Sequence, residues 1–187
     1  MLSKMAGMES VGYYNAAYKL SFSGMLFANT LTLVTYPYFS RMWPGDKDDV
    51  FKMFDGILKA LIIVSVAFAL SASILSENII ALVFGEQYRN SVMLFNILVW
   101  SVPPLYVMHL TGRVLEAIGE QRFTANTMLI SVAINISLNF ILIRKYGAVG
   151  ASIATVFTSF LIVAIHMVCI KMRMGFPMFN MPIVKVG

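Results

Sequence analysis

Polar side chains recur at helical spacing inside an otherwise apolar segment near the start of the chain. Asn15, Lys19 and Ser23 stand four residues apart, so a helix places them on one face, beside Tyr14 and Tyr18. A cation and amides are costly against lipid, so this face should look into protein or into a water-filled cavity. A simpler interpretation also fits, in which Lys19 extends to the lipid headgroups and the tyrosines form an interfacial belt.

Two further pairs of polar side chains could line such a cavity. His109 and Arg113 lie one turn apart, although they could equally be a packing residue and an interfacial cation. Asn135 and Asn139 are also one turn apart, and such a pair either joins helices by hydrogen bonds or lines a polar cavity. The candidate residues for a substrate cavity are therefore Tyr14, Asn15, Tyr18, Lys19, His109, Arg113, Asn135 and Asn139.

The sequence carries no pattern typical of catalysis or of metal binding. It lacks HExxH, GxSxG and CxxC, and it lacks the glycine motifs that bind phosphates or dinucleotides. Every Asp and Glu falls in a loop or at a helix end, and the single cysteine, Cys169, cannot form an internal disulfide. We therefore predict no enzymatic activity, no metal site and no cofactor.

The elements that must position the candidate residues are apolar stretches long enough to cross a bilayer. A hydrocarbon core about 30 Å thick is crossed by about 20 helical residues, and a helix satisfies its own backbone hydrogen bonds. Hydrophobic residues make up 59% of the chain and charged residues 12%, whereas about 25% charged is usual in soluble domains. We predict an all-α polytopic membrane protein with about five transmembrane helices near 12–38, 53–76, 91–112, 124–143 and 147–170, and a short outer interfacial segment at 77–90.

Two sequence features should shape how these helices pack. Pro103 and Pro104 lack backbone donors, so the third helix should kink near its middle. The fifth helix begins with small residues at spacings that allow two helix backbones to approach closely. These predicted packing residues are Gly147, Gly150, Ala151 and Ala154.

The distribution of lysine and arginine predicts the orientation in the membrane. Five spans place a small basic group on one side, namely Lys4, Arg89, Arg144 and Lys145. They place a larger group on the other side, namely Arg41, Lys47, Lys52, Lys59, Arg113, Arg122, Lys171 and Arg173. Cytoplasmic loops are enriched in these residues, so the second side and the C-terminus should be cytoplasmic. The net charge of +5 is spread over loop ends, which favours a membrane and not a nucleic acid as the partner.

Several stretches, taken in order, resemble one family. They are VGYYNAAYKL, YPYFSR, ENIIALVFGEQYRNSV and LEAIGEQRFTANTMLISVAINISLNFILIRKYGAVGASIATV. The combination of a YxxAY opening, an FGxxY segment, an LN pair and a YGxxGAxxAT start is similar to the C-terminal half of the polysaccharide-biosynthesis membrane proteins. These are the lipid-linked oligosaccharide flippases of the multidrug/oligosaccharidyl-lipid/polysaccharide exporter superfamily.

This resemblance implies a two-lobed helical bundle around a cavity that opens alternately to the two faces of the cytoplasmic membrane. The chain would supply most of the second lobe, and the first lobe of the same protein would be a missing partner. The substrate implied is a lipid-linked sugar, with Lys19 as a cation for phosphate and Asn15, Tyr14 and Tyr18 as polar groups for sugar. Two alternatives stay open, a multidrug antiporter lobe of the same superfamily and a structural membrane subunit without transport activity. Every Asp and Glu falls in a loop or at a helix end, and this lack of membrane-embedded carboxylates favours the flippase over the antiporter.

Overall fold

The chain folds as a bundle of helices, seen here in a computed structural model that describes residues 2–43 and 45–175. In chain order the elements are α1 (Leu2–Phe22), α2 (Met25–Met42), α3 (Lys47–Ile74), α4 (Ser76–Phe84), η1 (Glu86–Tyr88), α5 (Ser91–Leu98), η2 (Val99–Ser101), α6 (Val102–Ala117) and α7 (Gln121–Met174). The prediction of an all-α membrane protein is confirmed. The C-terminal residues 176–187, which the sequence predicts to be cytoplasmic, lie outside the described residues.

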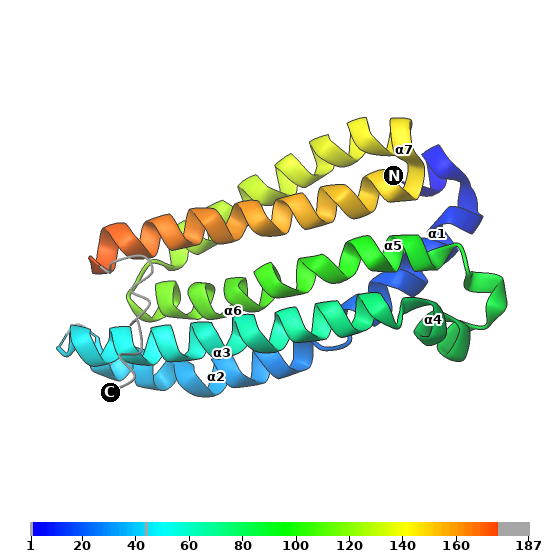
Figure 1. Cartoon of the computed structure of the whole chain (residues 1–187). Helices are drawn as coiled ribbons and strands as arrows, with labels where there is room; N and C mark the ends of the chain where they lie inside the picture. Colours follow the sequence, from blue (N-terminus) through cyan, green and yellow to red (C-terminus); the bar gives the residue numbers. More distant parts are fainter. Residues whose placement is uncertain (1, 44, 176–187) are drawn as a thin grey trace, which may run out of the picture.

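Within the described ranges, three helical stretches are long and apolar enough to cross a membrane, namely Lys47–Ile74, Ser91–Ala117 and Gln121–Met174. The last is far longer than one crossing requires, and Figure 1 shows it as two antiparallel arms. The arms meet at Gly147, whose φ of 56° and ψ of −135° are not helical. Glycine adopts a positive φ without the steric cost that a Cβ would bring. The predicted helices 124–143 and 147–170 lie on these two arms, which we call the α7 hairpin.

The structure corrects the single helix predicted at 12–38, which is divided between α1 and α2 at Ser23 and Gly24. The Ser23 hydroxyl donates to the carbonyl of Leu20 at 2.8 Å, a local bond that competes with helical pairing. Tyr106 of α6 donates its hydroxyl to the carbonyl of Gly24 at 2.6 Å. A break inside an apolar segment requires such a partner, because lipid offers none to a released carbonyl.

The two prolines mark a change of helix type. The predicted helix 91–112 consists of α5, one 3-10 turn and α6, with Pro103 and Pro104 in the first turn of α6. A proline in the first turn removes no intrahelical hydrogen bond, because the donors there have no partner within the helix. The prolines therefore begin a new helix just beyond the 3-10 turn.

The predicted segment 53–76 lies mostly on α3, which begins earlier, at Lys47. Asp46 caps this helix, since its carboxylate accepts a hydrogen bond from the backbone N–H of Asp49 at 3.1 Å. The predicted interfacial segment 77–90 contains α4 and η1, which meet at Gly85 with a φ of 84°.

The continuous α5–α6 stretch forms the centre of the bundle. α6 packs against α2, α3 and α7, whereas α5 packs against α1 and α7. Residues without solvent exposure line this centre, including Leu98, Val99, Val102, Leu110, Val114 and Leu115. Figure 1 shows α4 and the hairpin turn at one end of the bundle, and the α2–α3 and α6–α7 connections at the other. The segments carrying the two predicted basic groups thus lie at opposite ends.

Candidate functional site

An open groove of about 390 Å³ lies between α1 and the α7 hairpin. Its polar lining consists of Tyr14 and Asn15 from α1 and Asn139 from the first arm of α7. Its apolar lining consists of Leu2, Val11, Ile143 and Ala151. The structure therefore brings together three candidate residues that are far apart in the sequence. We refer to this hollow as the α1–α7 groove.

Hydrogen bonds hold two of the polar side chains of the groove, those of Tyr14 and Asn139, in place. The Tyr14 hydroxyl lies 3.2 Å from the hydroxyl of Thr155 on the second arm. The Asn139 amide nitrogen donates to the side-chain oxygen of Asn135 at 2.8 Å. Asn135 in turn donates to the hydroxyl of Thr158 at 3.2 Å. Of the asparagine pair, Asn135 therefore joins the two arms, and Asn139 lines the groove.

Lys19 and Tyr18 lie further along α1, outside the groove lining. Tyr18 stacks on Tyr14 with ring centroids 6.0 Å apart, and on Phe22 with centroids 4.1 Å apart. Lys19 is exposed, one turn beyond Asn15. It forms none of the ion pairs found in the described part of the chain. Its ammonium is thus available to an anionic group near the groove.

His109 and Arg113 do not join the groove. His109 lines a separate hollow of about 180 Å³ beside the break between α1 and α2, together with Asn29, Phe22, Met25 and Leu26. Arg113 donates to the carboxylate of Glu116 at 2.9 Å. The charge of Arg113 is therefore paired within its own helix.

The predicted packing residues lie on the hairpin in two different roles. A Cβ at Gly150 would overlap the backbone carbonyl of Leu142, so the arms meet there without room for a side chain. Ala151 and Ala154 are buried with 5% and 0% exposure. Gly147 was predicted to share a packing stripe with Ala151, but it forms the turn, because its backbone conformation suits a residue without a Cβ.

His166 is a buried polar residue that the sequence did not single out. It has no solvent exposure. Its Nδ1 lies 3.2 Å from the Thr111 hydroxyl of α6, and its Nε2 lies 3.0 Å from the Thr127 hydroxyl of the first arm. One ring thus links α6 to both arms of the hairpin. An ionisable residue inside an apolar stretch was the available signal, but no local pattern indicated its two partners.

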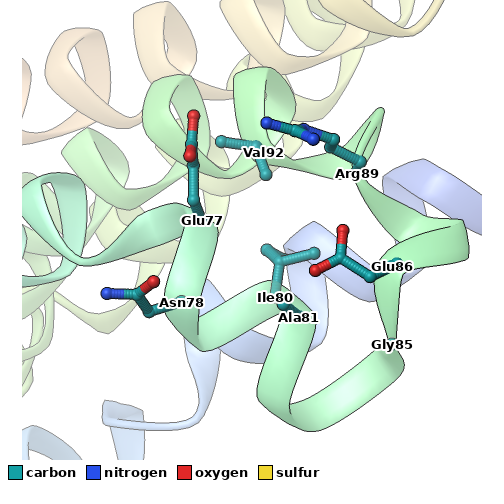
Figure 2. Close-up of a pocket in the computed structure, with 8 residues that line it drawn as sticks. All are labelled: Glu77, Asn78, Ile80, Ala81, Gly85, Glu86, Arg89 and Val92. Carbon is teal, nitrogen blue, oxygen red and sulfur yellow. The ribbon is translucent and has the colours of Figure 1, made fainter.

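A charged hollow of about 110 Å³ lies at the end of the bundle that holds α4. Figure 2 shows Glu77 on α4 and Glu86 and Arg89 on the connection to α5, placed around Ile80. All three charged side chains are exposed. The sequence predicts that segment 77–90 lies at a membrane interface, where water can reach such groups. Within residues 2–43 and 45–175, no group of three or more His, Cys, Asp or Glu side chains is arranged to hold a metal ion.

Known proteins resemble this chain over much of its length. A family model described as polysaccharide biosynthesis protein matches residues 1–93. The probable low-salt glycan biosynthesis flippase Agl15 of Haloferax volcanii is 28% identical over 147 residues, which are 78% of this chain and 31% of that protein. The capsular polysaccharide biosynthesis protein CapF of Staphylococcus aureus is 22% identical over 164 residues, which are 86% of this chain and 41% of that protein.

A shorter match connects the chain to a different transporter. The probable multidrug resistance protein NorM of Bacillus cereus is 31% identical over 98 residues, which are 49% of this chain and 22% of that protein. No solved structure matches the chain significantly. The chain spans 31% and 41% of the lengths of Agl15 and CapF. The resemblance found in the sequence is confirmed, in that the chain is similar to membrane proteins of polysaccharide biosynthesis.

Proposed function

We propose that this chain is part of a flippase that moves a lipid-linked oligosaccharide or polysaccharide precursor across the cytoplasmic membrane. The observation that carries the proposal is the α1–α7 groove, which joins Tyr14, Asn15 and Asn139 in a chain whose relatives include a named glycan flippase. The protein acts as a carrier and not as an enzyme, since its polar groups are suited to binding and release.

The groove and its surroundings match the parts of such a substrate. Amide and phenol groups can exchange hydrogen bonds with sugar hydroxyls. Lys19, exposed one turn from Asn15, supplies a cation for a phosphate linkage. The apolar tail of the substrate stays in the surrounding lipid, and therefore needs no enclosed site in the protein.

The remainder of the transporter lies outside this chain. The chain spans 31% of Agl15, so we propose that a first lobe of the same protein completes the cavity. We also propose that the end of the bundle with the α2–α3 and α6–α7 connections faces the cytoplasm. The larger of the two basic groups lies in segments near this end.

Lys19 gives the functional test. In the full-length protein reconstituted into liposomes, Lys19→Ala should reduce translocation of lipid-linked sugar about tenfold or more, because a hydrogen bond to a charged group is lost. Lys19→Arg should retain part of the activity, since the charge survives while its geometry changes. Lys171→Ala removes an exposed lysine near the end of α7 and serves as the matched control. Full activity in folded Lys19→Ala would contradict the proposed role of Lys19.

The partial match to NorM supports a second candidate, a multidrug antiporter lobe. Antiport coupled to a cation usually depends on carboxylates inside the membrane. Asp55 lies in the N-terminal part of α3 and is paired with Lys59 at 2.6 Å, which leaves it poorly suited to that role. Drug efflux by the full-length protein, without translocation of lipid-linked sugar, would favour the antiporter.

A further inference from the structure

The hydrogen of the Tyr14 hydroxyl points toward Thr155 on the second arm. Thr155 donates its only hydroxyl hydrogen to the backbone carbonyl of Ala151 at 3.0 Å. Its oxygen can therefore only accept from Tyr14, whose oxygen lies 3.2 Å away. Tyr14 is thus the donor in this pair. The lone pairs of its oxygen are what it can offer to a ligand.

The amide orientation of Asn139 is fixed by a similar argument. Its nitrogen lies 2.9 Å from the backbone carbonyl of Asn135, an oxygen that can only accept. The NH₂ group must therefore face its own helix. The Asn139 side-chain oxygen is left as the outer atom of the amide, and it accepts none of the hydrogen bonds found within the described residues.

Asn135, on the first arm, reinforces this orientation through its bond to Thr158 of the second arm. Thr158 donates its hydroxyl hydrogen to the carbonyl of Ala154 at 2.7 Å, so it can only accept from the Asn135 nitrogen at 3.2 Å. The Asn135 nitrogen also lies 3.4 Å from that carbonyl. The side-chain oxygen of Asn135 therefore turns toward Asn139 and accepts from it at 2.8 Å. Backbone carbonyls of the hairpin thus set the direction of the hydrogen bond from Tyr14 to Thr155, and of the bonds that run from Asn139 through Asn135 to Thr158.

We infer that the α1–α7 groove selects uncharged hydrogen-bond donors, namely the hydroxyl groups or the acetamido N–H of a sugar. Tyr14 and Asn139 both offer acceptors to the groove, and no charged side chain is part of its lining. A phosphate carries only acceptor oxygens when ionised, so it would oppose these two oxygens, and the lining offers it no cation, only the neutral amide of Asn15. This inference rests on the proposed function, and it assigns the groove to the glycan and the phosphate to another part of the site.

Two small probes test the inference on the unmodified full-length protein in detergent micelles. Methyl N-acetylglucosaminide and its fully N- and O-methylated counterpart share a ring and its oxygens, but only the first carries O–H and N–H donors. Saturation-transfer NMR should show binding of the first and none of the second. Inorganic pyrophosphate should not compete with the bound sugar. Equal binding of the methylated sugar, or competition by pyrophosphate, would overturn the inference.

Variants then locate the binding. Tyr14→Phe and Asn139→Leu should each weaken sugar binding about fivefold, the loss expected for one neutral hydrogen bond. Ser137→Ala is the control, because this exposed hydroxyl on the same arm bonds only to the carbonyl of Ala133. Unchanged sugar binding in folded Tyr14→Phe and Asn139→Leu would also overturn the inference.

Translocation of lipid-linked sugar by the unmodified protein is measured in parallel. If the protein translocates lipid-linked sugar but binds the methylated and unmethylated sugars equally, only the donor selectivity of the groove is contradicted. Donor-dependent sugar binding without any translocation would contradict the proposed function alone. The two failures are therefore distinguishable.

Discussion

His166 shows how one buried side chain can connect three helical segments. The Thr127 hydroxyl donates to the carbonyl of Thr124 at 2.9 Å, so it must accept a hydrogen bond from Nε2 of the imidazole. A neutral ring with its hydrogen on Nε2 leaves Nδ1 as an acceptor 3.2 Å from the Thr111 hydroxyl, whose single hydrogen has the carbonyl of Met108 as a second acceptor at 3.2 Å. When Thr111 donates to Nδ1, every polar atom of the ring has a partner. The two arms of the hairpin are thereby held against α6.

The network predicts unequal effects of removing its members. Thr127→Val should lower the free energy of unfolding by about 1–3 kcal/mol, because it leaves the buried N–H of His166 without an acceptor. His166→Leu should cost less, about 1 kcal/mol, since Thr127 keeps its bond to Thr124. Unfolding of the purified protein in detergent micelles measures both changes, with Ser137→Ala as the control. A larger loss in His166→Leu would contradict this account of the network.

The sequence predicted which polar residues could line a groove, but not that α1 and the α7 hairpin would bring them together. Four-residue spacing placed Asn15 and Asn139 on polar helical faces, because helical geometry depends only on local sequence. Their meeting in one groove depends on how α1 packs against the hairpin, which spacing does not determine. Arg113 appeared available for the same reason, although Glu116 binds it in the folded chain.

At the scale of the elements, apolar length predicted the two helices that form the arms of the hairpin, and small residues predicted a close helix contact without identifying the partner helix. The break between α1 and α2 was not predicted, because the apolar character continues through it. The break depends on a hydrogen bond from the hydroxyl of Tyr106 to the carbonyl of Gly24, two residues that lie 82 positions apart in the sequence. A partner so distant in sequence leaves no local signal. The breaks at the prolines and at Gly147 coincide with residues that disfavour helix.

The close contact within the hairpin predicts a steric effect. Gly150→Ala, and more strongly Gly150→Leu, should lower the yield of folded protein, because even a Cβ would overlap the carbonyl of Leu142. Gly56→Ala is the matched control, since a Cβ at this helical glycine meets nothing within 4 Å. That control should be neutral, or stabilising by about 0.5–1 kcal/mol. Size-exclusion chromatography of equally expressed variants measures the yield, and a normal profile for Gly150→Leu would show that the arms separate freely.

At the scale of the whole molecule, the separation of the two basic groups predicts how the bundle sits in the membrane. The α2–α3 and α6–α7 connections lie at one end, opposite α4. A positively charged end favours the cytoplasmic side during insertion. The charged hollow of Glu77, Glu86 and Arg89 would then lie at the outer surface.

Cysteine labelling tests this orientation. Single cysteines at the exposed positions Asp48 and Gln121 should react with a membrane-impermeant reagent only from the cytoplasm, and one at Gln87 only from outside. The native Cys169 is buried, and its replacement by Ala gives the background for all three variants. Labelling of position 48 from outside would reverse the orientation.

The polar contacts between the two arms of the hairpin also affect the order in which the helices insert and pack in the bilayer. Its arms are made in succession, and they match their own polar groups, with Asn135 bonded to Thr158 and Glu120 paired with Arg173 at 2.8 Å. They can therefore enter the lipid together as a unit that already satisfies these groups. α1 is made long before, yet Tyr14 finds its partner only on the second arm. Although α1 is made before both arms, it is thus among the last of the described helices to reach its final place.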